Sequence, residues 1–153
     1  MQPMELVYAS ESLDSVKSDI QPLLERQWEE LAVFKDIPLD PDWAVYHAID
    51  GAGNLAIFTA RAGGVLIGYA VYFVRRHHHY RVVYAQNDIF WVDSDYRQSH
   101  VGSELLKFAE GQLAERGVGF VHTGTKTKHP LLAKLLLANG HEPFEQTFVK
   151  RLS

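Results

Sequence analysis

Two apolar runs joined by a pair of glycines constrain the fold of this chain more than any other feature. The segment LAIFTARAGGVLIGYAVYFV spans residues 55–74, with Gly63 and Gly64 near its centre. Runs of β-branched and aromatic residues favour strands, and two glycines suit the tight turn of a β-hairpin. The pattern therefore predicts two antiparallel strands joined at Gly63-Gly64.

The chain before this hairpin is expected to form one strand and two helices. Residues 4–10 (MELVYAS) have the composition of a first strand. A helix is predicted after the capping signal at residues 18–19, because apolar residues recur at helical spacing from there on, with Pro22 in its first turn. Prolines make residues 35–42 a loop, and residues 43–50 are expected to form a short second helix.

The chain after the hairpin alternates between strands and helices. Strands are predicted at residues 84–92, 117–125 and 144–152, and helices at residues 101–117 and 130–139. The resulting order, β-α-α-β-β-β-α-β-α-β, indicates a single α/β domain over residues 1–153. It combines an antiparallel hairpin region with a later strand-helix-strand unit.

Charge and composition exclude several classes of function. The 153 residues carry a formal net charge of −4, so no general polyanion-binding surface is expected and nucleic acid is not a predicted partner. The chain has no cysteine, which excludes disulfides, thiolate metal sites and a cysteine nucleophile. The N-terminal MQPMELVYAS lacks the basic and apolar regions of a signal peptide, and no apolar run is long enough to span a bilayer. A cytoplasmic protein without a membrane partner is the default expectation.

A turn of small polar residues follows the apolar strand end IFWV. The stretch YRQSHVGSELLKFAE, residues 96–110, has Arg97 at its entrance and continues at helical spacing. Where a strand runs directly into a helix, the outward backbone N–H groups and the helix dipole favour an anion such as phosphate. Arg97 adds a charge-assisted donor. A plain connection between two elements explains the same pattern equally well.

The wider stretch VDSDYRQSHVGSELLKFAE resembles the acetyl-CoA signature of the GCN5-related N-acetyltransferase (GNAT) superfamily. Val92 ends the strand, Tyr96 and Arg97 match the signature, Gly102 takes the second glycine position, and a Leu-Leu pair follows in the helix. The order of elements is similar along nearly the whole chain. The resemblance implies a mixed, mainly antiparallel sheet of about six or seven strands with splayed central strands, flanked by about four helices.

The same resemblance implies an N-acetyltransferase with acetyl-CoA as co-substrate, a primary amine as acceptor and no metal. The backbone of the strand end would pair with the pantetheine arm and polarise the thioester oxygen, and the turn would bind the pyrophosphate. The implied cofactor-binding residues are Phe90, Trp91 and Val92 on the strand, and Arg97, Gln98, Ser99, His100, Val101, Gly102 and Ser103 in the turn.

Two residues depart from the family's pattern. His100 stands where the first glycine is usual, and a positive φ there would disfavour histidine, although its amide still donates. Leu136 replaces a tyrosine that often protonates the departing thiolate. A thiol pKa of about 8.5 lets the thiolate leave near neutral pH, with Tyr84 or a water as an alternative proton donor.

By register from Val92, Asp88 matches the strand carboxylate that serves as general base in many members of this family. Unpaired carboxylates avoid apolar surroundings, so an aspartate in the strand end QNDIFWV is unusual. An acceptor amine with a pKa of about 10.4 must lose a proton before it attacks. Pairing of Asp88 with a nearby cation, or a role at a bulge, is the structural alternative.

Other conspicuous residues have a structural explanation beside a functional one. Residues 77–79 are consecutive histidines, but successive strand side chains point to opposite faces, so the three cannot converge on one metal ion. His122 and His129 are expected to flank the cleft, in contact with a substrate or in structural hydrogen bonds. Three lysines near the second strand-helix junction would either meet the cofactor's 3′-phosphate or form a solvated face. They are Lys126, Lys128 and Lys134.

Three functions stay open at this level. The first is direct acetyl transfer to an amine with a general base. The second is a GNAT-fold acyl-CoA-binding module without turnover, suggested by His100 and Leu136, against which Asp88 argues. The third is acyl transfer to a non-amine acceptor. Neither the acceptor, which ranges from a small amine to a protein amine, nor the oligomeric state, for which a homodimer is one option, follows from the sequence.

Overall fold

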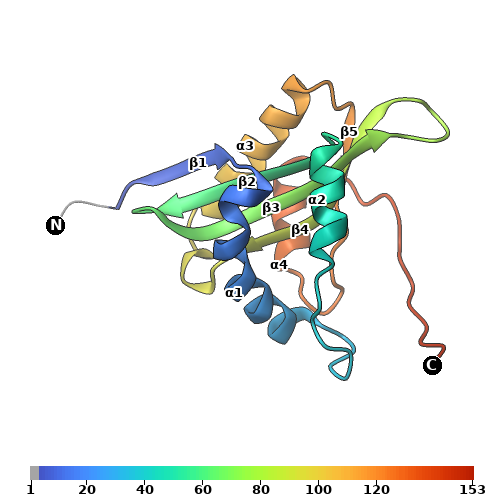
Figure 1. Ribbon diagram of the computed structural model, residues 1–153, viewed down its shortest axis with the longest axis horizontal. Helices are drawn as coiled ribbons and strands as arrows, with labels where there is room; N and C mark the ends of the chain where they lie inside the picture. The colour runs from blue at the N-terminus through green and yellow to red at the C-terminus, as the bar shows by residue number, and fades with distance from the viewer. Residues whose placement is uncertain (1–3) are drawn as a thin grey trace.

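Five strands form one sheet at the centre of the protein in the computed structural model, which describes residues 4–153 (Figure 1). The strands are β1 (Leu6–Ser10), β2 (Leu55–Ala62), β3 (Val65–Arg76), β4 (Val83–Val92) and β5 (Phe120–His122). They follow one another in the order β1-β2-β3-β4-β5; the first three neighbouring pairs are antiparallel, and β4 pairs with β5 in parallel. The predicted mixed, mainly antiparallel sheet is confirmed, and residues 1–3 of the expected domain lie outside the described part.

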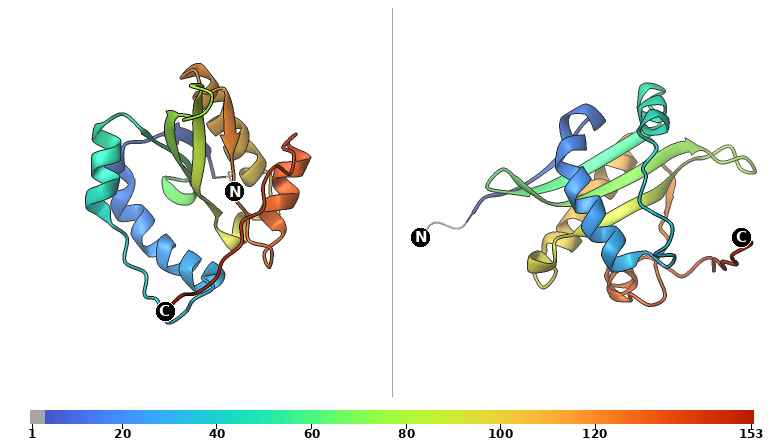
Figure 2. Two further views of the ribbon diagram at one scale, coloured as in Figure 1. Left: turned by 90° about the vertical axis from the view of Figure 1, so that its right-hand side faces the viewer. Right: turned by 60° about the horizontal axis from the view of Figure 1, so that its bottom comes forward.

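Four helices of the described chain cover the two faces of this sheet, as an α/β fold requires (Figure 2). They are α1 (Leu13–Leu31), α2 (Trp43–Gly51), α3 (Val101–Glu115) and α4 (Leu131–Ala138). Val16 of α1 shares a core with Ile57 on one face, and Leu105 of α3 shares a core with Phe58 on the other. Because both faces are covered, β2 is apolar along most of its length instead of alternating. Within residues 4–153, no helix is both long and apolar enough to cross a membrane.

The hairpin predicted from Gly63 and Gly64 is confirmed. Ala62 at the end of β2 pairs with Val65 at the start of β3. The two glycines between them have φ angles of 55° and 82°. Positive φ at both central residues is the requirement of a type I′ turn, whose twist matches that of the strands it joins.

The first helix begins earlier than the sequence analysis predicted. The Ser12 side chain accepts a hydrogen bond from the Ser15 N–H (3.2 Å) and caps α1 at its N-terminus. The predicted start at residues 18–19 is therefore wrong, and Pro22 lies inside the helix and not in its first turn. The helix continues through Pro22 because burial of its apolar face outweighs the one backbone hydrogen bond that proline cannot donate.

The predicted last strand, residues 144–152, does not form, so the described sheet has five strands and not six or seven. Residues 141–153 contain no helix or strand and run past β5 toward the 32–42 loop (Figure 1). There Arg151 donates to both carboxylate oxygens of Asp36 (2.6 and 2.7 Å). Strand composition does not make a strand without a neighbouring edge to pair with.

Strand β5 is shorter than its predicted range, 117–125, and this opens the sheet. It pairs with β4 only from Tyr84 to Gln86, so β4 continues as far as Val92 without a neighbouring strand on that side. The predicted splay of the central strands is confirmed. It leaves an edge of backbone N–H and C=O groups that a ligand is able to pair with.

Candidate active site

The turn between β4 and α3 ends in a helix N-terminus suited to an anion. α3 starts at Val101, whose N–H donates to the Ser99 Oγ (3.3 Å). The amides of Gly102 and Ser103 lie in the first turn, where no acceptor exists within the helix, so they point outward with the helix dipole behind them. A side chain at Gly102 would come within 3.3 Å of Leu135. Glycine therefore also lets α4 lie close to this turn.

His100 occupies the first-glycine position without strain. Its φ of −81° and ψ of 0° lie on the right-handed side of backbone space, which histidine adopts readily. The positive φ considered in the sequence analysis does not occur at His100. The departure from the family's pattern therefore imposes no positive-φ strain on the turn.

Arg97 ties the end of β4 to α1. Its two terminal nitrogens donate to the two carboxylate oxygens of Glu30 (2.6 and 2.8 Å), and its Nε donates to the Val92 carbonyl (2.8 Å). Hydrogen bonding from Arg97 holds the pKa of Glu30 below its ordinary value. Arg97 thus positions the strand end, and the paired carboxylate offsets the positive charge that was expected to face a phosphate.

A cavity of about 510 Å³ opens between this turn, the unpaired part of β4 and α4, and we call it the turn cavity. Most of the predicted cofactor-binding residues line it, namely Phe90, Trp91, Val92, Arg97, Ser99, His100, Gly102 and Ser103. Gln98 and Val101 do not, and Val101 is buried in the core. One wall is basic, with Lys126, Lys128, His129 and Lys134.

Asp88 is the extra residue of a β-bulge. Val71 of β3 pairs with Ile89 and Tyr72 pairs with Asn87, so Asp88 has no partner on β3. The side-chain amide of Asn87 donates to the carbonyls of Val71 (3.3 Å) and Ile89 (3.0 Å) and so stabilises the bulge. Bulges re-aim side chains next to active sites. The bulge explains how an apolar strand accommodates a carboxylate.

Tyr46 of α2, which the sequence analysis did not identify, donates a hydrogen bond to the Asp88 Oδ2 (2.5 Å). Its ring packs between Trp43 and Phe73, with centroid distances of 5.8 and 6.0 Å. Surrounding protein raises the pKa of Asp88 above its ordinary value, and the Tyr46 hydroxyl opposes part of the rise. The Asp88 carboxylate is therefore a stronger base than a free aspartate, although it opens onto a cavity.

A second cavity, of about 520 Å³, lies between α1, α2 and the 32–42 loop, and we call it the loop cavity. Its walls are mostly aromatic and aliphatic. Asp88 and Ile89 line both this cavity and the turn cavity. The two cavities therefore meet at the bulge of β4, with the Asp88 carboxyl at their junction.

Several residues singled out in the sequence lie away from this junction. Tyr84 and His122 line neither cavity, and the Tyr84 ring stacks on Phe120 at 5.4 Å. Leu136 is buried, with 7% of its surface exposed. Residues 77–79 lie in the turn after β3, and among residues 4–153 no group of three His, Cys, Asp or Glu is arranged to hold a metal ion.

Comparisons with known sequences and structures identify the family and the fold. The sequence model described as the acetyltransferase (GNAT) family matches residues 17–134. A search of curated protein sequences finds no match. The structural comparison, by contrast, finds many similar chains.

Three similar solved structures are acetyltransferases. An aminoglycoside acetyltransferase, meta-AAC0020, from an uncultured soil metagenomic sample and solved with sisomicin, has a TM-score of 0.77 at 15% identity over 97% of this chain and 95% of that one. Aminoglycoside N-acetyltransferase AAC(6')-Iy, solved with CoA, has a TM-score of 0.75 at 21% identity over 99% and 97%. A ribosomal-protein-alanine N-acetyltransferase from Brucella melitensis biovar Abortus 2308 has a TM-score of 0.74 at 17% identity over 97% and 100%. These likenesses show a shared fold, and the family match over most of the sequence shows that the chain belongs to the acetyltransferase (GNAT) family.

Proposed function

We propose that this chain transfers an acetyl group from acetyl-CoA directly to a primary amine, with Asp88 as the general base. The observation that carries the proposal is that Asp88 and Ile89 line both cavities. A thioester in the turn cavity and an amine in the loop cavity would meet beside one carboxylate of raised pKa. Residues 1–153 would act as a single catalytic domain.

The chemistry of the turn cavity supports acetyl-CoA as the donor. The first amides of α3, at Gly102 and Ser103, favour the pyrophosphate, and the lysines of the basic wall favour the 3′-phosphate. The unpaired edge of β4 at residues 90–92 offers backbone groups to the amides of the pantetheine arm. We assign Arg97 a positioning part, because it is paired with Glu30. The similar enzyme AAC(6')-Iy was solved with CoA.

The proposed reaction begins with removal of a proton from the acceptor amine. The acceptor arrives as an ammonium ion with a pKa of about 10.4, and Asp88 takes one proton from it, directly or through one water. The neutral nitrogen attacks the carbonyl carbon of the thioester, and a backbone N–H of β4 stabilises the oxyanion. The C–N bond forms, the C–S bond breaks, the electron pair leaves on sulfur, and the second proton of the attacking nitrogen passes to water or to the thiolate. A thiolate with a pKa of about 8.5 departs near neutral pH without a proton from position 136.

A binding module without turnover is the competing function. Such a module would hold acetyl-CoA in the turn cavity but would need no carboxylate at the junction of the two cavities. Asn87 stabilises the bulge that presents Asp88, and Tyr46 donates a hydrogen bond to it. Two side chains that place and tune one carboxylate favour an enzyme over a module.

Release of the CoA thiol from acetyl-CoA across a panel of amines tests the proposal. The chain has no cysteine, so a thiol reagent reports CoA without a background from the protein. Thiol release that requires both the protein and an amine is the expected result. A rise in melting temperature with acetyl-CoA but no amine-dependent release would identify a binding module, and the absence of both responses would contradict both functions.

A further inference from the structure

The loop cavity is apolar apart from a few carboxylates. Aliphatic side chains of α1 and of the 32–42 loop make most of its wall, together with aromatic rings. The aromatic residues are Trp28, Phe34, Trp43 and Tyr46. The charged residues are Asp40, Asp42 and Asp88. The lining contains no lysine, arginine or histidine, so it favours an apolar ligand with a positively charged end.

One of the three carboxylates is placed to receive an ammonium group at the junction with the turn cavity. The Asp42 side chain accepts a hydrogen bond from the Val45 N–H (3.1 Å) and caps α2. Asp40 is exposed in the 32–42 loop, which forms part of the cavity wall. Asp88 alone of the three also lines the turn cavity. Away from these carboxylates, a second ammonium group in the cavity would face aromatic and aliphatic side chains and lose hydration without an anionic partner.

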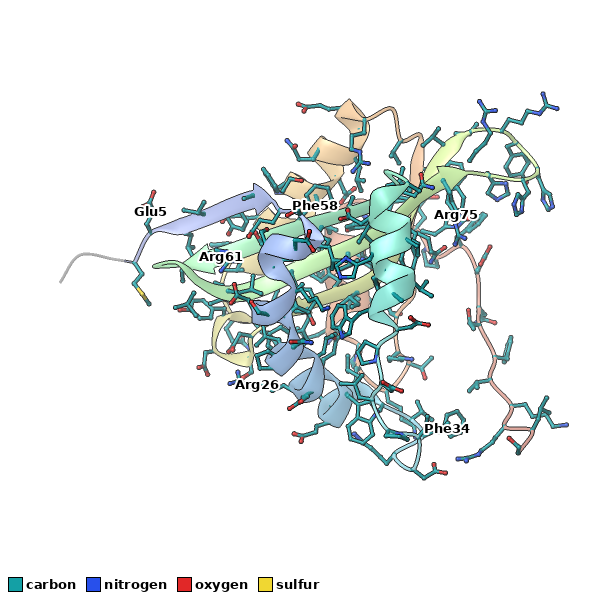
Figure 3. All side chains as sticks on the ribbon, viewed as in Figure 1. Glu5, Arg26, Phe34, Phe58, Arg61 and Arg75 are labelled. Atoms are coloured by element: carbon teal, nitrogen blue, oxygen red, sulfur yellow. The ribbon has the colours of Figure 1, made fainter. Side chains whose placement is uncertain are left out.

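Three cations of the protein already lie over aromatic rings that line the loop cavity. Since none of them lines the cavity, each contacts its ring from outside. The cation-to-centroid distances are 4.9 Å for Lys17 Nζ and Trp43, 4.7 Å for Lys35 Nζ and Trp28, and 5.3 Å for Arg151 Cζ and Phe34. Figure 3 shows Phe34 in the loop below α2. Arg151 is paired with Asp36, but an incoming polycation would approach Lys17 and Lys35, which carry charges of its own sign.

We propose that the acceptor is a primary amine on an apolar body, aliphatic or aromatic, with no second cationic group. This inference rests on the proposed acetyl transfer at Asp88 and names the class of acceptor that the site selects. The ammonium group lies at Asp88, and the apolar body lies among the aromatic rings of the loop cavity. Polycations such as sisomicin, with which the similar meta-AAC0020 was solved, fit this site poorly.

A series of n-alkylamines from propylamine to heptylamine tests burial of the apolar body. These amines have nearly the same pKa, so they differ in chain length and hardly in the reactivity of the amine. We expect kcat/KM, measured by CoA thiol release, to rise about fourfold for each methylene that enters the cavity. Phenethylamine should exceed propylamine, and spermidine and sisomicin should be poorer acceptors than hexylamine. A flat series, or polycations as the best acceptors, overturns the inference while acetyl transfer itself stands. Thiol release with no amine at all would reject both the transfer and the inference that rests on it.

A pair of matched variants tests whether the loop cavity holds the apolar body. Ile37 lines the cavity and is 51% exposed, whereas Val65 at the start of β3 lines neither cavity and is 65% exposed. Ile37→Asn should reduce the gain per methylene to below about twofold for the longest amines. It should leave the rise in melting temperature with acetyl-CoA unchanged, because Ile37 does not line the turn cavity. Val65→Asn should show the same dependence of kcat/KM on amine chain length as the wild type. If kcat/KM rose by the same factor per methylene in both variants, the apolar body would have to lie elsewhere and the inference would be overturned.

Discussion

Asp88→Asn removes the proposed base with the smallest change of shape. The bulge should persist, because the Asn87 side chain stabilises it independently of Asp88. The substituted side chain still offers an oxygen to the Tyr46 hydroxyl, which now donates to the Asp88 Oδ2 at 2.5 Å. The ability to accept a proton from the amine is lost.

The expected loss in kcat/KM near neutral pH is roughly 10²–10⁴-fold, the usual contribution of a general base. This corresponds to about 2.7–5.4 kcal/mol of transition-state stabilisation. The raised pKa of Asp88 favours the upper part of the range, because it brings the base closer to the pKa of the amine. Acetyl-CoA affinity should hardly change, because the proposed phosphate donors lie in the α3 turn.

Asp88→Asn should lower activity without lowering the free energy of unfolding. The pKa of Asp88 is raised in the folded protein, so the folded state binds this proton more tightly than the unfolded chain. Its contribution to the free energy of unfolding is present below the ordinary pKa of aspartate and is lost as pH rises through the raised value. At neutral pH the wild type carries a carboxylate that the surrounding protein partly desolvates, and Asp88→Asn does not. The variant should melt at the same temperature as the wild type or higher.

The assay is the pH dependence of kcat/KM, by CoA thiol release, beside a melting curve for each protein. The deficit of Asp88→Asn should shrink as pH approaches the pKa of the amine, where the acceptor is already neutral. A variant that melts normally and shows the wild-type pH profile would remove Asp88 from the mechanism. A variant that loses activity and melting temperature together at every pH would give Asp88 a structural role instead.

Three further substitutions probe the turn and the junction. Gly102→Val directs a side chain toward Leu135 and the turn cavity, so acetyl-CoA should no longer raise the melting temperature; an undiminished rise would refute the turn assignment. His100→Gly should leave acetyl-CoA affinity nearly unchanged, because φ is ordinary there and only the amide is used; a large loss would show that the imidazole contacts the cofactor. Tyr46→Phe removes a hydroxyl that lowers the pKa of Asp88, so the acid limb of the pH profile of kcat/KM should move to higher pH. An acid limb at the wild-type pH would show that Tyr46 does not affect the pKa of the base.

Features set by neighbouring residues in the chain were predicted from the sequence. The Gly63-Gly64 turn, the strand that ends at Val92 and the helix that follows the turn all form as expected. The start of α1 was placed wrongly because Ser12 and Ser18 both precede apolar residues at helical spacing. Burial of the first turn against the sheet, which decides in favour of Ser12, is a tertiary effect.

Features that depend on distant partners were not predicted. Residues 144–152 have the composition of a strand, but pairing requires an edge at the right place and β5 does not pair with them. The register from Val92 identified Asp88, yet nothing in the sequence indicates that Tyr46, 42 residues earlier, reaches its carboxylate. The bulge was weighed as a structural alternative to catalysis for Asp88, and the structure shows that a bulge is also what turns this carboxylate toward both cavities.

The wall that the two cavities share at Asp88 and Ile89 has a consequence for steady-state kinetics. Donor and acceptor would reach the same short stretch of β4 from separate openings, so neither has to leave before the other enters. The chain also has no cysteine on which an acetyl group would wait between two half-reactions. A ternary complex would then be the reacting species, and initial rates measured with both substrates varied should give double-reciprocal lines that intersect. Parallel lines would require an acylated protein, whose nucleophile would have to lie within reach of this wall.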